Sequence, residues 1–341
     1  MSFSLYERVL RPALFKLDPE TAHHLALFCL RFPGLRPFLS QPADSRNARR
    51  LFGLKFPNLV GLAAGFDKNA VALPAWEALG FGFVEAGTIT SRGQPGNPKP
   101  RIFRVPEKEA LINRLGFNND GAEVVAERLR ALKASGRWPR IPVGLNIGKA
   151  KVTPVEEAPA DYLFSFEKLF PYADYFVLNI SSPNTPGLRT LQHAKALDTL
   201  LEAVQSNNLA RPAPKPVLVK IAPDLDFPQI EEILEAVQRR SVAGIVATNT
   251  TLDQSAIAES QRQEGGLSGA PMRQKATAIV KFIASKVSLP IIAVGGISDA
   301  ASAREKLDAG AALLQIYTGF IYRGPALISE ILASYDTARV G

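Results

Sequence analysis

The chain has 341 residues, 46% of them hydrophobic and 21% charged, which is typical of a globular protein with a large core. Its single cysteine, Cys29, excludes an internal disulfide and is expected to be a packed thiol, and the three histidines lie away from any carboxylate cluster, which argues against a metal site. The net charge of +8 is spread along the chain without an aromatic-interleaved basic run, which argues against a nucleic-acid partner.

Residues 1–40 do not share the alternation of strands and helices in the rest of the chain. Their pattern predicts two short helices, the first over 3–17 and the second up to about residue 32. Asp18 and Pro19 are typical of the N-cap and first turn of the second helix. That helix is apolar almost all round, so protein or lipid must cover it.

Basic residues border both helices, which favours a peripheral contact with an anionic membrane surface. The alternative is a helical cap packed against the bottom of a barrel. Neither helix reaches the ~20 residues of a bilayer span. The N-terminus lacks the apolar core and cleavage site of a signal peptide, so we expect the protein on the cytoplasmic side of a bacterial-type cell.

Eight short apolar runs recur along the rest of the chain, and helical patterns separate them. Strands that alternate with helices pair in parallel, and eight such units predict a closed (β/α)8 (TIM) barrel in the α/β class. An open doubly wound sheet is the alternative, but its Gly-x-Gly-x-x-Gly fingerprint is missing. The predicted strands are 59–63, 83–86, 143–147, 175–180, 217–221, 244–247, 291–294 and 312–316, and the clearest helices are 121–133, 229–239, 272–286 and 300–309.

The segment 91–118 is longer than a usual strand-to-helix loop of a barrel. Its first part is rich in glycine and proline, and the runs 102–105 and 111–112 predict a small antiparallel excursion. An insertion at the active face of a barrel is a candidate lid or wall.

The most informative segment is 179–192, Asn-Ile-Ser-Ser-Pro-Asn-Thr-Pro-Gly-Leu-Arg-Thr-Leu-Gln. It follows a short apolar run, and its two prolines and its glycine stop that strand from continuing. Hydroxyl and amide groups therefore lie on a rigid loop at a strand's carboxyl end, where barrel enzymes carry their chemistry. No ionised group precedes Arg189, so the loop suits an uncharged, amide-rich ligand and proton transfer by a hydroxyl. An ordinary proline-rich turn is the alternative.

Glycine clusters follow the last two predicted strands, at Gly295-Gly296 and at Gly319 after Tyr317-Thr318. Barrels often bind a phosphate at this position. The stretch 265–269, Gly-Gly-Leu-Ser-Gly, could close over the same phosphate with its backbone N–H groups. A tight turn explains each cluster alone, but together they favour a phosphorylated cofactor.

Lys68 follows the first strand and Lys220 lies at the end of the fifth, in a predicted pocket with few carboxylates. A lysine there is either a Schiff-base nucleophile or a fixed positive charge, and a fixed charge would stabilise an anionic reduced flavin. Side-chain amides at the strand ends both donate and accept, which suits a cyclic imide or ureide. They belong to Asn113, Asn146, Asn179, Asn184 and Asn249.

Four strings resemble the dihydroorotate dehydrogenase family, and the resemblance covers nearly the whole chain. They are Ala-Ala-Gly-Phe-Asp-Lys, Asn-Arg-Leu-Gly-Phe-Asn-Asn, Asn-Ile-Ser-Ser-Pro-Asn-Thr-Pro-Gly-Leu-Arg and Gly-Gly-Leu-Ser-Gly. Two features point to the membrane-associated, quinone-dependent class (class 2). The soluble classes use a cysteine as base where this chain has Ser182, and the extra N-terminal helices belong to the quinone-linked class.

The resemblance implies an FMN-binding barrel over 41–341, preceded by a helical segment, 1–40, for membrane contact and quinone access. It implies oxidation of (S)-dihydroorotate to orotate in de novo pyrimidine biosynthesis, with electrons passing through one FMN per chain to a membrane quinone. The expected place is the cytoplasmic side of the cell inner membrane, as a peripheral protein. The identity of the quinone and the oligomeric state stay open, and a monomer is compatible.

The resemblance also implies roles for individual residues. Ser182 would take the C5 proton while the C6 hydride goes to flavin N5, and Arg104 and Tyr317 would lie near the inner end of a quinone tunnel. The substrate would be held by Lys68, Asn113, Arg114, Leu115, Gly116, Phe117, Asn179, Asn184, Asn249 and Thr250. FMN would be held by Ala64, Gly65, Lys68, Thr88, Asn146, Asn179, Lys220, Thr248, Ser268, Gly269, Gly295, Gly296, Tyr317 and Thr318.

A serine hydroxyl is a poor base near neutral pH, so it needs desolvation and a proton exit, for which Thr185 and a water beside Phe117 are candidates. Two other functions compete. One is a lysine-dependent aldolase with Lys220 as nucleophile, which a bound yellow chromophore would exclude. The other is a non-catalytic, membrane-associated barrel, which predicts a broken set of site residues, whereas the set here is intact.

Overall fold

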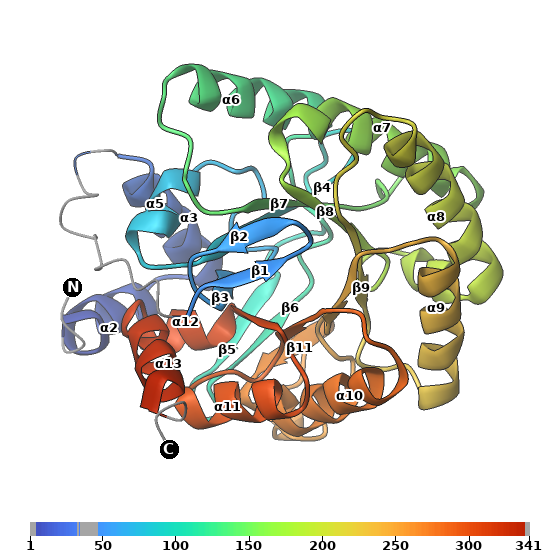
Figure 1. Cartoon of the computed structure of the whole chain (residues 1–341). Helices are drawn as coiled ribbons and strands as arrows, with labels where there is room; N and C mark the ends of the chain where they lie inside the picture. The colour runs from blue at the N-terminus through green and yellow to red at the C-terminus, as the bar shows by residue number, and fades with distance from the viewer. Residues whose placement is uncertain (1–4, 33, 35–46, 338–341) are drawn as a thin grey trace.

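The computed structural model describes residues 5–32, 34 and 47–337. The predicted domain boundary at residue 40 lies outside the described residues. The described parts are a short helical segment and a closed barrel of eight parallel strands with helices around it (Figure 1).

The barrel is built from the eight apolar runs that the sequence predicts, so the (β/α)8 fold is confirmed and the open sheet is excluded. Each strand pairs in parallel with the preceding one, and the last closes onto the first, with Leu314 opposite Val60. The runs are continuous because the barrel interior covers one face and helices cover the other. The strands are β3 (Val60–Leu62), β4 (Phe83–Ile89), β7 (Val143–Ile147), β8 (Tyr175–Asn179), β9 (Val217–Ile221), β10 (Gly244–Ala247), β12 (Ile291–Val294) and β13 (Leu313–Ile316).

A helix follows each barrel strand and packs on the outside (Figure 1). Asp226 and Asp299 start two of these helices by forming capping boxes with Gln229 and Ser302, and all four clearest predicted helices are confirmed to within two residues at each end. The outer helices are α5 (Leu73–Ala78), α6 (Ala122–Ala134), α7 (Ala158–Leu169), α8 (Ala194–Leu209), α9 (Phe227–Arg239), α10 (Arg273–Lys286), α11 (Ala300–Asp308) and α13 (Ala326–Thr337), with the short α12 (Thr318–Arg323) ahead of α13.

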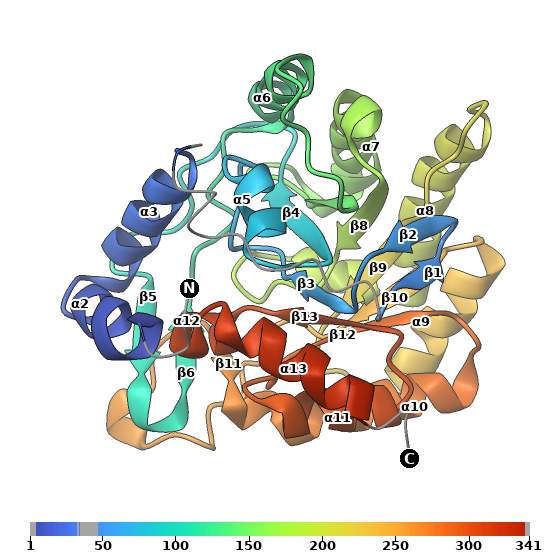
Figure 2. The same cartoon turned by 60° about the vertical axis from the view of Figure 1, so that its left-hand side comes forward.

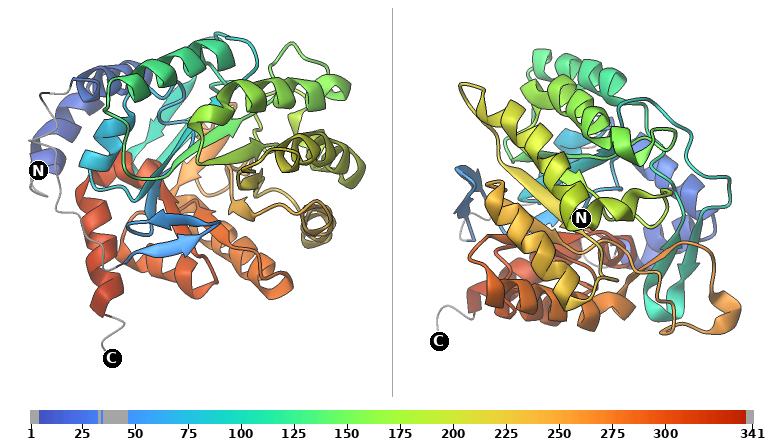
Figure 3. Two further views of the ribbon diagram at one scale, coloured as in Figure 1. Left: turned by 45° about the horizontal axis from the view of Figure 1, so that its top comes forward. Right: turned by 90° about the vertical axis from the view of Figure 1, so that its right-hand side faces the viewer.

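Two small antiparallel sheets lie at opposite ends of the barrel, as Figures 2 and 3 show. The hairpin of β1 (Arg49–Leu51) and β2 (Leu54–Phe56) lies at the amino end. At the carboxyl end, β5 (Ile102–Val105) pairs with β6 (Ala110–Asn113), which confirms the predicted excursion. The sequence did not predict that β11 (Gly266–Gly269) joins them as a third strand, because glycine disfavours strands.

The N-terminal helices lie beside β5 at the carboxyl end, so they do not cap the bottom of the barrel (Figure 2). A π-helical turn, η1 (Tyr6–Leu10), continues into α2 (Arg11–Phe15), and α3 (Pro19–Leu30) follows. Asp18 caps α3 by accepting two backbone N–H groups of its first turn, which confirms the predicted helix start.

Arg104 of β5 joins the C-terminus of α2 to the insertion through hydrogen bonds. Its guanidinium donates to the carbonyl oxygens of Leu14, Phe15 and Leu17 at 2.8–3.3 Å and lies over the ring of Phe15. The guanidinium therefore binds carbonyl groups at the C-terminus of α2, where a cation is favourable.

Much of the apolar surface of the N-terminal helices is left exposed. Cys29 is exposed as well, so the expectation of a packed thiol is wrong: α3 buries the face that carries Glu20 and Ala22, and Cys29 lies outside it. No helix in the described ranges combines the length and the apolar character needed to cross a bilayer. The large exposed apolar side chains of this segment are Leu5, Val9, Leu10, Leu17, Leu25, Phe28 and Phe32.

A buried ion pair joins α3 to the insertion. The carboxylate of Glu20 receives three hydrogen bonds from the Arg101 guanidinium, at 2.7–3.2 Å, and both side chains are nearly inaccessible to solvent. Burial alone would raise the pKa of Glu20, but the hydrogen bonds and charge of Arg101 outweigh it and lower the pKa to about 2. Arg101 also donates to the carbonyl oxygens of Pro95 and Asn97, so one guanidinium fixes both segments.

Replacing Glu20 with glutamine should lower the free energy of unfolding by about 3 kcal/mol, because the buried Arg101 would lose its counter-charge. In the wild-type protein this contribution is complete above the unfolded pKa, about 4.3. It is lost as the pH falls through the folded pKa of about 2. Urea unfolding of both proteins at pH 7 and pH 3 measures the effect.

Glu127→Gln is the control, since Glu127 pairs with Arg130 on the exposed surface and its loss should change little. Equal unfolding midpoints for the two variants would show that the buried pair does not stabilise the docked helix.

Candidate functional site

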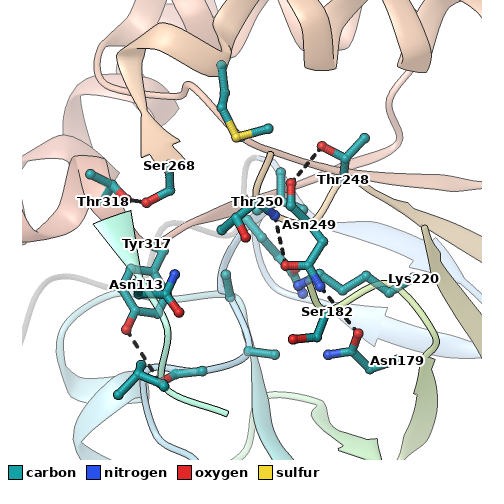
Figure 4. A pocket seen from close by; sticks show the side chains of 18 of the residues that line it. Asn113, Asn179, Ser182, Lys220, Thr248, Asn249, Thr250, Ser268, Tyr317 and Thr318 are labelled. Atoms are coloured by element: carbon teal, nitrogen blue, oxygen red, sulfur yellow. Dashed lines mark hydrogen bonds between the residues drawn. The ribbon is translucent and has the colours of Figure 1, made fainter. Parts of the chain in front are cut away.

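A deep cavity opens at the carboxyl ends of the barrel strands, and Figure 4 shows the side chains that converge on it. Its wall combines strand ends, the loop after β8 and the insertion sheet, so segments far apart in sequence meet there. Most predicted site residues line it. They are Ala64, Gly65, Lys68, Thr88, Asn113, Leu115, Gly116, Phe117, Asn179, Ser182, Asn184, Lys220, Thr248, Asn249, Thr250, Ser268, Gly269, Gly295, Gly296, Tyr317 and Thr318.

Buried amides and hydroxyls form one hydrogen-bond network across neighbouring strand ends. Asn179 Nδ2 donates to Thr88 Oγ1 at 2.8 Å, and Thr88 Oγ1 donates to Asn146 Oδ1 at 2.5 Å. Asn249 Nδ2 donates to Asn179 Oδ1 at 3.3 Å and to Ser181 Oγ at 3.0 Å. Because each amide is held by another, their free edges are fixed before any ligand binds. Asn146 lies behind this network and does not itself line the cavity.

The loop after β8 carries Ser182 into the cavity. The Ser182 side chain is buried, and its Oγ accepts the backbone N–H of Asn184 at 3.3 Å. Asn184 Nδ2 donates to the carbonyl oxygen of Asn113 at 3.0 Å, which joins the loop to the insertion. The Thr185 hydroxyl is buried and has no hydrogen-bond partner among the described residues. The loop therefore presents two hydroxyls with unused bonding capacity.

Arg189 holds this loop from outside the cavity. Its Nε donates to the carbonyl oxygen of Ser181 at 3.1 Å, and Nη2 donates to that of Thr250 at 3.3 Å. Nη1 pairs with Asp224 at 2.9 Å. One guanidinium thus fixes the loops after β8 and β10 relative to each other, a role that composition alone did not suggest.

The far end of the cavity is a cradle of backbone and hydroxyl groups. Gly269, Gly295 and Gly296 all have positive φ, and a Cβ at Gly296 would overlap the backbone of Arg273. The hydroxyls of Ser268 and Thr318 lie 2.9 Å apart and join β11 to the start of α12 (Figure 4). Such a concavity of N–H and hydroxyl groups suits an anion such as phosphate.

Two lysines, the buried Lys220 and the half-buried Lys68, supply the positive charge of the cavity. Burial lowers the pKa of Lys68 to about 8, and the charge of Arg101 acts in the same direction. Burial also lowers the pKa of Lys220, while the nearby carboxylate of Glu85 opposes this shift. Glu85 lies inside the barrel, and the sequence analysis did not single it out.

A second cavity lies between α3 and the barrel, and it shares Lys68, Leu115 and Tyr317 with the first. His23 and Phe28 of α3 line it on the other side, and charged residues such as Asp67, Asp120 and Arg128 also line it. Burial lowers the pKa of His23 to about 3, so its imidazole is neutral at physiological pH. Tyr317 therefore lies at the boundary between the amide-lined cavity and the cavity under α3.

Two other predicted residues lie outside both cavities. Arg114 turns away because its guanidinium donates to the carbonyl oxygen of Pro100 and pairs with Glu264. Arg104 is occupied by the carbonyl groups at the end of α2. The cavity also includes Gln315, a polar residue in an apolar strand, which was a signal that the sequence analysis did not use.

These features define a (β/α)8-barrel enzyme with an anion cradle and an amide-rich pocket at the same rim. A family model described as dihydroorotate dehydrogenase matches residues 47–336, and the chain belongs to this family of flavin-dependent oxidoreductases.

Curated relatives with the name dihydroorotate dehydrogenase (quinone) match nearly the full length. The protein from Christiangramia forsetii is 49% identical, covering 96% of this chain and 97% of the relative. That from Anaeromyxobacter dehalogenans is 51% identical, covering 95% and 90%. Among solved structures, the Eimeria tenella enzyme in complex with ferulenol has a TM-score of 0.87 at 36% identity, covering 95% of this chain and 93% of that chain.

Gly296→Ala should abolish retention of bound flavin, because the new methyl group overlaps Arg273 backbone that cannot move without shifting α10. The visible absorbance of the purified protein measures flavin content. Gly136→Ala is a matched control: Gly136 has nearly the same positive φ, 68° against 74°, but nothing lies within 4 Å of the added Cβ. Flavin retained equally in both variants would mean that the cradle does not hold the cofactor.

Proposed function

We propose that this chain oxidises (S)-dihydroorotate to orotate in de novo pyrimidine biosynthesis and passes the electrons through FMN to a membrane quinone. The observation that carries the proposal is the pairing of two cavities. One is lined by amides and hydroxyls and contains Ser182. The other opens between α3 and the barrel, and Tyr317 lines both.

The residues present fit FMN. The anion cradle around Gly295 and Gly296 suits its phosphate, and a Cβ at Gly296 would collide with the backbone of Arg273 and disturb the cradle. Lys220 lines the cavity, and its side chain forms no hydrogen bond with any described residue, so its ammonium group is available to a ligand. When bound, FMN would supply the acceptor for the substrate's C6 hydride. Thr88, Asn146 and Asn179 would orient it from the network beneath.

Ser182 is the proposed base for the C5 proton. Its burial removes competing water, and the Asn184 N–H that reaches Oγ at 3.3 Å stabilises negative charge developing on the hydroxyl oxygen. Thr185, whose hydroxyl is buried and unpartnered among the described residues, is the proposed next carrier of the proton.

Four amides are proposed to hold the ring of the substrate. Asn113, Asn179, Asn184 and Asn249 can read the alternating N–H and C=O edge of a cyclic ureide. Lys68 supplies a cation for the substrate's carboxylate. The Thr250 hydroxyl is buried without a partner among the described residues, and it lines the same cavity, which supports a role toward a ligand.

The cavity under α3 is the proposed inner end of the quinone tunnel, with Tyr317 at the boundary to the flavin site. Arg104 is proposed to act there by holding α2 in place. The exposed apolar side chains of the N-terminal helices support peripheral contact with the cytoplasmic side of the inner membrane, where the quinone is dissolved.

Ser182→Ala should retain flavin but reduce it with dihydroorotate ~10²–10⁴ times more slowly, the usual contribution of a positioned base. Anaerobic stopped-flow absorbance measures this step without any quinone. Ser182→Cys is the matched variant, because a thiol restores a base at the same place, and its rate should recover as the pH rises. A near-normal rate for Ser182→Ala would remove Ser182 from this role.

Phe28→Asp should weaken binding to anionic vesicles and oxidation by a long-chain quinone, since it places a charge on the proposed membrane face. Flavin reduction by dihydroorotate should be unchanged. Leu209→Asp is the control, because Leu209 has a similar exposure, 59% against 55%, but lies at the end of α8. Vesicle co-sedimentation of both variants decides: equal binding would contradict membrane contact through α3.

A further inference from the structure

A carboxylate is buried inside the barrel, next to Gln315, which lines the cavity. Glu85 of β4 is fully inaccessible to solvent. Its Oε1 accepts Asn146 Nδ2 at 2.7 Å, and its Oε2 accepts Gln315 Nε2 at 2.5 Å. Both oxygens thus accept hydrogen bonds from amide N–H groups, an arrangement that stabilises a carboxylate.

The charge of this carboxylate needs a partner, because an isolated charge in a protein interior is costly. Lys220 of β9 is the cation on which the Glu85 charge acts. The other titratable group facing Glu85 is Tyr175, whose hydroxyl is buried and has no partner among the described residues. Burial and the charge of Glu85 raise the pKa of Tyr175 well above its usual value, so its hydroxyl stays neutral.

Lys220 depends on this carboxylate in turn. Its side chain is buried and makes no hydrogen bond with any described residue, and a lysine in such a place readily loses its proton. Two amides connect the carboxylate to this lysine: Asn146 donates to Glu85, and Asn179 Nδ2 donates to Asn146 Oδ1 at 3.3 Å. Asn179 is in turn paired with Lys220 in the register of β8 and β9.

We propose that Glu85 is the counter-ion that keeps Lys220 positively charged beneath the bound flavin, and that it thereby raises the reduction potential of the flavin. Glu85 is a positioning residue in this account, since it acts through Lys220 and does not touch the substrate. The inference rests on the proposed function, because it requires a flavin above Lys220.

The direction in which the flavin reduction potential changes when Glu85 is removed distinguishes a role through Lys220 from a direct electrostatic effect of Glu85 on the flavin. A carboxylate acting straight on the flavin would disfavour the anionic reduced ring, so its removal would raise the potential. A carboxylate that keeps Lys220 charged favours the reduced ring, so its removal lowers the potential.

Glu85→Gln tests this role, because it removes the charge and the barrel interior can still bind the new amide group. Gln315 Oε1 is buried without a hydrogen-bond partner among the described residues, so the Gln315 amide can turn and accept the new N–H group. At pH 8 the ratio of reduced to oxidised flavin at a fixed potential should fall about tenfold, which is about 30 mV for a two-electron couple. Spectroelectrochemical titration of the holoenzyme measures it.

The difference in reduction potential between Glu85→Gln and the wild type should become smaller as the pH falls, because Lys220 regains its proton. Lys68 also titrates near the site, with a pKa of about 8, so variant and wild type are compared at each pH. In a Lys220→Met background, Glu85→Gln should instead raise the potential, since only the direct effect remains. Glu127→Gln is the control for removing a distant, exposed carboxylate.

A potential that rises or stays unchanged in the single variant would overturn the inference while leaving the proposed function intact. Absence of flavin from the wild-type protein would overturn the proposed function first. If Glu85→Gln fails to hold flavin, infrared spectra of wild-type holoenzyme with ¹³C-labelled glutamate carboxyls decide at pH 7. A protonated-carboxyl C=O band would contradict the account, and its absence would support an ionised Glu85.

Discussion

Closure of eight parallel strands forces their carboxyl ends onto one rim, and every feature of the site follows from that constraint. Asn146, Asn179 and Asn249 come from three different strands or strand ends, yet their amides meet through Thr88 and Ser181. No local segment could arrange them. The strands themselves are held by apolar contacts on both faces, so polar side chains at the rim carry little of the stability of the barrel and are available for chemistry.

The insertion connects this rim to the N-terminal helices. Arg101 pairs with Glu20 of α3 and also donates to the carbonyl oxygen of Asn97. Asn97 Nδ2 donates to the carbonyl oxygen of Asn184, in the same loop as Ser182, at 3.2 Å. A short series of hydrogen bonds thus runs from α3, which lines the second cavity, to the loop that carries the proposed base. The position of α3 is therefore coupled to that of the loop.

The sequence predicts the barrel well because strands buried on both faces are continuous apolar runs, and because Asp226 and Asp299 mark helix starts. It predicts many of the rim residues because they lie at the end of such a run or in the loop that follows it. It does not predict contacts between segments far apart, such as Glu20 with Arg101, or the addition of β11 to the insertion sheet. Glu85 was missed because only the register across strands places it beneath Lys220, although a carboxylate within an apolar run was a visible signal.

The central claim is that one flavin is reduced by dihydroorotate and re-oxidised by a quinone. Anaerobic addition of equimolar dihydroorotate to the purified holoenzyme, followed by a quinone, tests flavin reduction and flavin re-oxidation in one experiment. The account predicts that the visible flavin absorbance bleaches and that orotate appears in equal amount, after which a ubiquinone or menaquinone analogue restores the absorbance. Absorbance that does not bleach, or that bleaches and is restored by neither quinone, would contradict it.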